Sequence, residues 1–287
     1  MTAPAQMTWK TPQGEKKLVF DHPLIMAIVN ITPDSFSDGG LHFSPEAALE
    51  QARIHMLEGA DILDLGAETT RPGSVPTPAA EEWRRLEPVL TALVKDPGCP
   101  PISVDTNKAE VAEKALDAGA SIINDIFAGR NDPQILPLAA RRGVPVILMH
   151  MQGDPRTMQQ NPHYDDVVRE VHDFLLEAAE KAMGLGIDRS RIILDPGLGF
   201  GKTAEHNLSL LKHLDRVYPA GFRSLMALSR KAFLGNILGG RPPRERDWAT
   251  AAASLLAVQK GAEIIRVHEV RPSRDALRSA GASNKAP

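Results

Sequence analysis

Residues 192–203 read IILDPGLGFGKT and join a short apolar run to a loop with three glycines. The run is typical of a strand that is buried on both faces. Asp195 ends that strand, and a helical pattern begins near Glu205. A carboxylate at the end of a buried strand, followed by glycines that let the backbone approach closely, is typical of a ligand site in an α/β protein. We therefore interpret this stretch as part of a binding site.

Two nucleotide-binding motifs are similar to this loop, and neither fits it. A Walker A loop that ends in the Gly-Lys-Thr of residues 201–203 needs a glycine where this chain has Pro196. The dinucleotide fingerprint needs Gly-x-Gly-x-x-Gly, whereas the glycines here occupy positions 197, 199 and 201. The rest of the chain must therefore indicate which ligand uses the loop.

Apolar runs that favour strands alternate with helical patterns eight times along the chain. The runs are residues 24–29, 61–65, 101–104, 121–124, 144–149, 191–194, 224–228 and 263–267. Strands separated by helices form parallel sheets, and eight such units can close on themselves. An open, doubly wound sheet is the alternative, but its usual glycine fingerprint is missing after the first run. We predict an α/β fold, a (β/α)8 TIM barrel.

The repeat also predicts the domain boundaries. No linker interrupts residues 24–280, which we expect to form a single barrel domain. Residues 1–23 are expected to form a tail and a short hairpin that turns at Gln13-Gly14, and residues 281–287 a disordered tail.

Capping signals predict where the helices lie. Ser44-Pro45 and Thr77-Pro78 each pair an N-cap residue with a proline at the first helical position. The remaining helices are expected from about residues 105–107 to Gly119, from 165 to 184, from about 245 to 261, and after Pro272.

Composition excludes several kinds of partner. The 287 residues carry a net charge of −3, whereas nucleic-acid binding favours a strongly basic surface. No window approaches the roughly 18 apolar residues of a membrane span, and residues 1–11 lack a signal-peptide pattern. The single cysteine, Cys99, rules out an internal disulfide and a cysteine-based zinc site. We expect a cytoplasmic enzyme with small-molecule substrates, and neither nucleic acid nor membrane as partner.

The ends of the strands predict the site, because barrel enzymes place catalytic residues there. Each run is followed by at least one polar or ionisable group. The main candidates are Asn30, Arg71, Asp105, Asn124, His150, Asp195, Lys231, Arg266 and His268. Thr106 and Asp125, taken singly, are more typical of capping residues, and His150 of a packed or hydrogen-bonded histidine.

The candidates divide into two chemical groups. Arg71, Arg266 and His268 suit a polyanionic phosphate, and Asn30 is able to share a hard cation with it. The buried acceptors Asp105, Asn124 and Asp195 suit a flat heterocycle that carries adjacent N–H donors. Lys231 would balance these acids and donate to the ring, and a planar guanidinium is able to stack on it.

Seven motifs, in order, carry a resemblance to a known family. They are NITPDSFSDGG (30–40), ETTRPG (68–73), SVDT (103–106), NDI (124–126), DPGLGFGK (195–202), SRK (229–231) and RVH (266–268). They closely resemble dihydropteroate synthase, and the resemblance runs from about residue 24 to 270. It implies a transferase of folate biosynthesis, usually a homodimer. That family condenses 7,8-dihydropterin-6-ylmethyl diphosphate with 4-aminobenzoate and releases dihydropteroate and diphosphate.

The resemblance also implies a role for each matching residue. The pterin pocket would be Asp105, Asn124, Asp195 and Lys231, with Ile126 and Met149 as apolar walls. The diphosphate site would be Asn30, Arg71, Arg266 and His268, with Asn30 also a ligand of Mg2+. The aminobenzoate side would be Phe36, Thr70, Pro72, Gly199 and Phe200. Of these residues, Arg71, Lys231, Arg266 and His268 would carry the catalysis, and Lys202 would lie behind the site or on the surface.

The chain departs from the family pattern at two places. The second loop commonly has Gly-Glu-Ser-Thr, where this chain has Ala67-Glu68-Thr69-Thr70. Some members have a serine after Ser-Arg-Lys that helps to hold the aminobenzoate carboxylate, and this chain has Ala232 there. We expect the first change to matter little and the second to weaken or alter aminobenzoate binding.

Two alternatives stay open at this point. A pterin-dependent methyltransferase barrel would share the acids and the amide, but it has no use for the cluster of Arg71, Arg266 and His268. A barrel that only binds pterin or phosphate would not need the long loops at residues 30–44 and 66–77, whose glycines are typical of mobile lids.

Overall fold

Eight parallel strands form a closed barrel in the computed structural model, which describes residues 5–32, 45–70 and 73–283. Around the barrel the order is β10-β3-β4-β5-β6-β7-β8-β9. The strands are β3 (Leu24–Asn30), β4 (Ile62–Gly66), β5 (Ile102–Asp105), β6 (Ile122–Asp125), β7 (Val146–Met149), β8 (Ile192–Asp195), β9 (Arg223–Ala227) and β10 (Ile264–Val267). The predicted TIM barrel is confirmed, and each strand ends within two residues of its predicted run.

The strand register brings the predicted site residues to one level of the barrel. Asn30 pairs with Gly66, Gly66 with Asp105, and Asp105 with Asn124, so four successive strands end together. On the other side of the barrel Met149 pairs with Asp195. Because the strands are parallel, all of these positions lie at the carboxyl end of the barrel.

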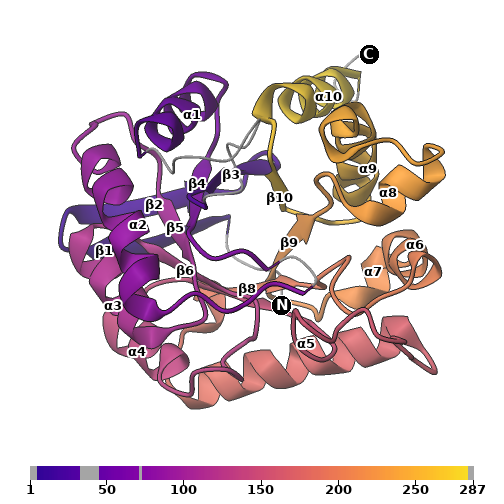
Figure 1. Ribbon diagram of the computed structural model, residues 1–287, viewed down its shortest axis with the longest axis horizontal. Helices are drawn as coiled ribbons and strands as arrows, with labels where there is room; N and C mark the ends of the chain where they lie inside the picture. Colours follow the sequence, from indigo (N-terminus) through magenta and orange to yellow (C-terminus); the bar gives the residue numbers. More distant parts are fainter. Residues whose placement is uncertain (1–4, 33–44, 71–72, 284–287) are drawn as a thin grey trace.

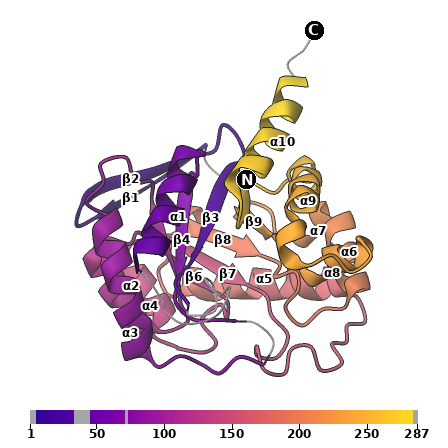
Figure 2. The same cartoon turned by 45° about the horizontal axis from the view of Figure 1, so that its top comes forward.

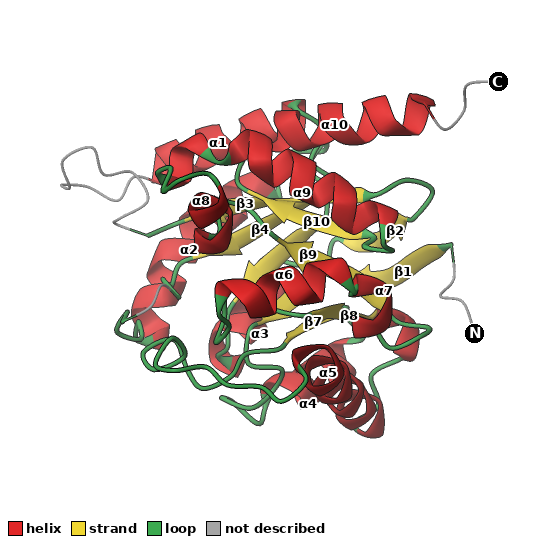
Figure 3. Ribbon diagram, turned by 90° about the vertical axis from the view of Figure 1, so that its right-hand side faces the viewer, coloured by secondary structure: helices red, strands yellow, loops and turns green. Residues whose placement is uncertain are grey.

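Helices surround the strands, as Figures 1 and 3 show. They are α1 (Pro45–Leu57), α2 (Ala79–Leu93), α3 (Ala109–Ala118), α4 (Ile135–Arg142), α5 (Val167–Gly184), α6 (Ala204–Lys212), α7 (Leu214–Val217), α8 (Ala232–Ile237), α9 (Asp247–Gln259) and α10 (Val270–Ser283). In the described connections, Arg189–Arg191 and Pro243–Glu245 each form a short 3-10 helix. No helix of the described residues combines the length and apolar character that a membrane span requires.

Several helix boundaries differ from the predictions. α2 begins at Ala79, so Pro78 takes the capping position and no side chain caps the helix. α3 begins at Ala109, later than expected, because the Ala109 N–H donates to Asp132 at 2.8 Å. That carboxylate comes from another loop, so the local sequence does not contain the signal.

The C-terminal helix is longer than predicted. α10 begins at Val270, with Pro272 inside its first turn, and it extends to Ser283. The expected tail is therefore wrong for residues 281–283, and residues 284–287 lie outside the described part. Figure 2 shows the last turns of α10 projecting past the barrel. The expected capping residue of α1, Ser44, also lies outside the described residues.

A two-stranded hairpin covers the opposite end of the barrel. It consists of β1 (Gln6–Thr11) and β2 (Gly14–Val19), and it turns one residue earlier than predicted, at residues 12–13. Trp9 of β1 is buried. The ring of Phe20, which follows β2, lies 3.6 Å from the guanidinium carbon of Arg223, the first residue of β9. The hairpin thus packs where the barrel strands begin (Figure 3) and leaves their carboxyl ends accessible.

Candidate functional site

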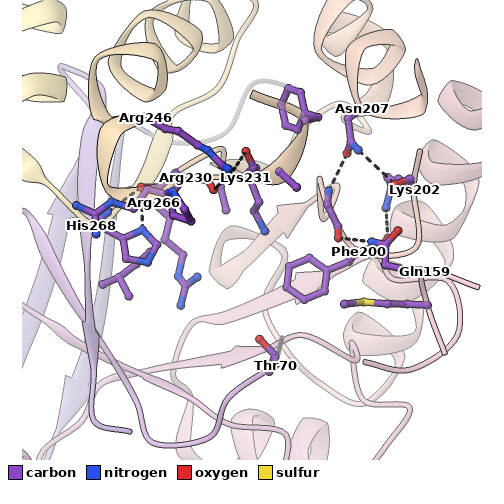
Figure 4. A pocket seen from close by; sticks show the side chains of 18 of the residues that line it. Thr70, Gln159, Phe200, Lys202, Asn207, Arg230, Lys231, Arg246, Arg266 and His268 are labelled. Atoms are coloured by element: carbon purple, nitrogen blue, oxygen red, sulfur yellow. Dashed lines mark hydrogen bonds between the residues drawn. The ribbon is translucent and has the colours of Figure 1, made fainter. Parts of the chain in front are cut away.

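A cavity of about 730 Å³ opens at the carboxyl ends of the strands. Eight residues proposed from the sequence line it: Asn30, Thr70, Asp105, Gly199, Phe200, Lys231, Arg266 and His268. Figure 4 shows Arg266 and His268 on one side, Gln159, Lys202 and Asn207 on the other, and Lys231 and Phe200 between them. The structure therefore brings together residues that are far apart in the sequence.

The other predicted site residues lie beneath the cavity or outside the described residues. Asn124, Met149 and Asp195 are buried and do not contribute to the cavity wall. Met149 and Ile126 belong to one apolar cluster, against which Phe200 packs. Phe36, Arg71 and Pro72 lie outside the described residues.

An ionic network connects the site across the inside of the barrel. Arg266 donates through Nε to Asp64 at 2.7 Å and through Nη2 to Asp105 at 2.6 Å. Asp64 also accepts a hydrogen bond from Asn124 Nδ2 at 3.1 Å. Sequence reasoning missed Asp64, although an isolated acid inside the apolar strand β4 was a signal that could have found it.

Burial disfavours the charged form of each ionisable group in this network, and the oppositely charged neighbours favour it. Desolvation raises the pKa of Asp105 and of Asp195, while Arg266 and Lys231 favour the ionised carboxylates. The two carboxylates beside Arg266 outweigh its desolvation, so the pKa of the guanidinium is raised and it stays charged. Burial lowers the pKa of Lys231 to about 8, despite the attraction of Asp195. The site is therefore a cluster of acids and cations that are largely shielded from bulk water, so their charges interact more strongly than they would in solution.

The glycine loop gives the backbone room beside this cluster. Gly197 has φ of 62°, and a Cβ there would lie 1.9 Å from the carbonyl oxygen of His150. Gly199 has φ of 82°, and a Cβ there would lie 3.0 Å from Cδ of Lys231. Asp195 accepts a hydrogen bond from Gly197 N at 2.7 Å, which holds the loop to the strand end. The glycines are thus needed for conformation and for close approach.

Lys202 corrects part of the sequence prediction, because it is not a surface residue. Its side chain is buried, and Nζ donates to the carbonyl oxygens of Gly197 at 2.9 Å and Phe200 at 3.0 Å. Nζ also lies 2.8 Å from His150 Nδ1. Burial lowers the pKa of Lys202 well below its usual value and that of His150 to about 2. Lys202 therefore supports the glycine loop from behind, and His150 is the buried, hydrogen-bonded histidine that was expected.

The turn after β9 aims two side chains at the cavity. Arg230, between them, also lines the cavity; it lies in the left-handed region with φ of 58° and binds Asp247 through Nε at 2.8 Å and Glu269 through Nη2 at 2.9 Å. Ser229 Oγ accepts from the backbone N–H of His268 at 3.0 Å and lies 2.9 Å from its Nδ1. The Lys231 ammonium lies 4.2 Å from the centre of the Phe200 ring. Anchoring Arg230 thus orients its two neighbours.

The second loop is held by a further carboxylate that sequence reasoning did not assign. Glu68 accepts from Thr77 N at 2.6 Å, from Asn107 Nδ2 at 3.0 Å and from Lys108 Nζ at 2.8 Å. Lys108 also binds the buried Glu82 at 2.6 Å. These contacts tie both ends of the segment that carries Thr70 to α2 and to the start of α3.

The expected capping roles of Asp125 and Thr106 are wrong, because α3 is preceded by Lys108 and α4 by Gln134. Both residues instead accept hydrogen bonds from backbone N–H groups in turns. Asp125 accepts from Phe127 N at 2.9 Å and from Gly129 N at 2.6 Å. Thr106 Oγ1 accepts from Lys108 N at 3.3 Å.

The residues also indicate what kind of metal ion the site could bind together with a substrate phosphate. Within the described residues no group of three His, Cys, Asp or Glu side chains is arranged to hold an ion. Mg2+ often has only one or two protein ligands and takes its other oxygens from substrate phosphate and water. The single amide oxygen of Asn30, at the cavity wall, is compatible with that type of site.

Comparisons with known proteins agree with this geometry. Residues 26–268 match the sequence profile of the family described as pterin binding enzyme. A dihydropteroate synthase of Neisseria meningitidis serogroup C is 44% identical over 278 residues, which cover 96% of this chain and 97% of the relative. The structure of the Xanthomonas albilineans dihydropteroate synthase with 4-aminobenzoic acid superposes with a TM-score of 0.88 at 47% identity, and covers 95% and 97% of the two chains. The structure of the same enzyme in complex with 7,8-dihydropteroate superposes with a TM-score of 0.86 at 45% identity, and the match covers 95% of this chain and 97% of that one.

Proposed function

The chain belongs to the dihydropteroate synthases, transferases of the pterin-binding family, and from this premise we propose how its site performs their reaction. The substrates are 7,8-dihydropterin-6-ylmethyl diphosphate and 4-aminobenzoate, and the products are 7,8-dihydropteroate and diphosphate. The observation that carries the proposal is the convergence of Asp105, Lys231, Arg266 and His268 on one cavity.

The pterin ring is held by the acceptors at the ends of three strands. Asp105, Asn124 and Asp195 accept from the ring and amino N–H groups, and Lys231 donates to a ring acceptor. The support is that Asp105 pairs with Asn124 in the sheet and that Asn124 and Asp195 are buried, since hydrogen bonds to charged groups gain strength where water is excluded. Apolar contacts come from Met149 and Ile126, which pack together beneath the loop.

The diphosphate is held by Arg71, Arg266 and His268. Two carboxylates already engage Arg266, so its charge is partly neutralised. We therefore assign it two roles, in which its flat face stacks on the pterin and its remaining N–H groups face the phosphate. Asn30 is the residue that would hold Mg2+, which when bound would stabilise negative charge on the diphosphate.

The reaction proceeds by departure of diphosphate before the amine attacks. The electron pair of the C–O bond leaves with the diphosphate, and positive charge spreads from the methylene carbon into the ring. Asp105 and Asp195 stabilise that positive charge, while Arg266 and His268 stabilise the negative charge on the leaving group. The aniline nitrogen then forms the new C–N bond, and one of its two protons is released to solvent. A steep rise of kcat with amine basicity, without any effect of pterin substituents, would instead indicate direct displacement.

The aminobenzoate ring packs beside the glycine loop. Thr70, Gly199 and Phe200 line that part of the cavity, and Phe36 and Pro72 complete it in our proposal. Ala232 also lines the cavity but has no hydroxyl with which to bind the carboxylate. We therefore expect Ala232→Ser to lower the KM for the aminobenzoate substrate and to leave the affinity for the pterin diphosphate unchanged.

We also propose that the enzyme is a cytoplasmic homodimer that uses α9 in its interface. Trp248 and Leu256 are exposed by 76% and 51% and stand eight residues apart, on the same side of that helix. Light scattering of the wild type should give twice the mass of the chain, and Trp248→Glu should give the single mass. A wild-type monomer would contradict the dimer, and cell fractionation tests the location.

Lys231→Ala tests the assignment of the site. Removing the ammonium leaves Asp195 and Asp105 with less counter-charge, so pterin diphosphate binding should fall strongly. Isothermal titration with the pterin diphosphate measures the effect. Unchanged affinity in a folded variant would overturn the pterin role of Lys231.

A further inference from the structure

We propose that Asp64 is a positioning residue that sets the orientation of Asn124 and Arg266 and thereby the selectivity for the pterin edge. The inference rests on the pterin pocket proposed above. Asp64 lies in the middle of β4, is fully buried and is not part of the cavity wall. Its Oδ2 is engaged by Asn124 and Arg266, so we assign Asp64 an indirect role, in which it acts through these two neighbours.

The contacts of Asp64 cross the interior of the barrel. The neighbours of β4 in the sheet are β3 and β5, but Asn124 lies on β6 and Arg266 on β10. One oxygen, Oδ2, accepts from Asn124 Nδ2 at 3.1 Å and from Arg266 Nε at 2.7 Å. A single carboxylate thus connects two strands that the hydrogen bonds of the sheet do not bring together.

The chemistry of a carboxylate decides which way the Asn124 amide points. A side-chain amide has nearly the same shape in its two flipped orientations, so its hydrogen bonds select one. The ionised Asp64, paired with Arg266, only accepts hydrogen bonds, and the Asn124 nitrogen must therefore face it. The carbonyl oxygen of Asn124 then adds an acceptor to those of Asp105 and Asp195. This arrangement favours a ring edge with amino and N–H donors and disfavours an edge that presents carbonyl oxygens.

The same carboxylate fixes the plane of Arg266. The guanidinium binds Asp64 through Nε and Nη2, at 2.7 and 2.6 Å, and Asp105 through Nη2 at 2.6 Å. Because the fork is rigid, these contacts define its plane and prevent rotation about the last bonds of the side chain. A loss of Asp64 would leave Arg266 with Asp105 alone, which is itself assigned to the substrate.

The test compares Asp64→Asn with a matched control, Asp61→Asn. Asp61 precedes the same strand at its other end, where it accepts from Ile25 N at 2.7 Å and binds Arg274 at 2.6 Å. Both substitutions remove a carboxylate from an arginine pair and exchange it for an amide. The control thus measures the effect of weakening β4 far from the cavity.

Three quantities are measured by titration and steady-state kinetics for the wild type and both variants. They are the Kd of the pterin diphosphate, the KM for the aminobenzoate substrate at saturating pterin, and the Kd ratio between 6-hydroxymethylpterin and its analogue with oxygen in place of the 2-amino group. For Asp64→Asn we expect a pterin Kd raised about tenfold or more, a KM changed less than twofold and a markedly smaller ratio. Asp61→Asn should stay within twofold of the wild type in all three.

The outcomes separate this inference from the proposed function. If the wild-type protein does not bind the pterin diphosphate, the proposed function itself is refuted. A wild type that binds, with Asp64→Asn equal to it in Kd and ratio, would overturn only the role of Asp64. Parallel changes in all three quantities, or the same changes in Asp61→Asn, would indicate a purely structural carboxylate and also overturn it.

A second measurement applies if Asp64→Asn does not fold. The side-chain amide resonances of Asn124 in the 15N-labelled wild type are assigned by their loss in Asn124→Ala. A hydrogen-bonded amide should exchange its protons slowly with solvent and keep that protection when the cavity is empty. Fast exchange in the empty enzyme would contradict the orienting contact.

Discussion

His150 offers a quantitative test of how the floor of the site is built. Its ring is buried at the carboxyl end of β7, with Nδ1 2.8 Å from Lys202 Nζ. Burial lowers its pKa to about 2, helped by the positive charges of Lys202 and Arg130. In the unfolded chain the imidazole has a pKa of about 6.5. The unfolded state therefore binds a proton that the folded state rejects, and stability that is complete above about pH 6.5 is lost as the pH falls toward 2.

The magnitude follows from this difference in pKa. Each pH unit below 6.5 lowers the free energy of unfolding by about 1.4 kcal/mol, which amounts to about 2 kcal/mol between pH 7 and pH 5. The perturbation is His150→Gln, because the amide oxygen accepts from Lys202 as Nδ1 does but does not titrate. Urea unfolding of both proteins at both pH values gives four free energies. The cost of the substitution itself cancels when each protein is compared with itself.

We expect the wild type to lose about 2 kcal/mol more than His150→Gln when the pH is lowered from 7 to 5. The other buried histidine with a lowered pKa, His55, is present in both proteins and does not contribute to the difference. Equal losses in the two proteins would refute the buried, neutral imidazole. A larger loss in the variant would contradict the expected sign of the effect.

Three further predictions concern the cavity. Gly197→Ala places Cβ 1.9 Å from a carbonyl oxygen and should lower the free energy of unfolding, measured with urea, by about 2 kcal/mol or more. The control Gly186→Ala also has a positive φ, but its Cβ would enter open space, so it should lower the free energy of unfolding by less. The affinity for pterin diphosphate should fall as the pH rises above about 8, because Lys231 then loses its charge; a flat profile from pH 8 to pH 10 would argue against its role. Chelation should abolish turnover and Mg2+ restore it, and Asn30→Ala should raise the Mg2+ concentration needed for half-maximal rate; an unchanged requirement would exclude Asn30 as a ligand.

The barrel could be predicted because its strands are apolar on both faces and recur at regular spacing. Helix boundaries were less predictable, since distant groups decide some of them. The Ala109 N–H at the start of α3, for example, is bound by Asp132 from another loop. The hairpin was predicted from a turn at Gln13-Gly14, but its position against Arg223 at the start of β9 was not.

The cavity wall could be predicted because parallel strands place their carboxyl ends at one end of a barrel. Asp64 was missed for the opposite reason, since it lies inside its strand and reaches Arg266 across the barrel. The direction of a loop side chain is also absent from the sequence. Lys202, for example, was expected to lie behind the site or on the surface, and the structure shows it pointing inward to His150.

Product formation from the two substrates tests the central claim most directly. The wild type is mixed with 7,8-dihydropterin-6-ylmethyl diphosphate, 4-aminobenzoate and Mg2+, and released diphosphate and 7,8-dihydropteroate are quantified together. We predict equal amounts of both products, formed only when both substrates are present, and a large loss of rate in His268→Ala. No diphosphate release, or release that does not require 4-aminobenzoate, would contradict the proposed reaction.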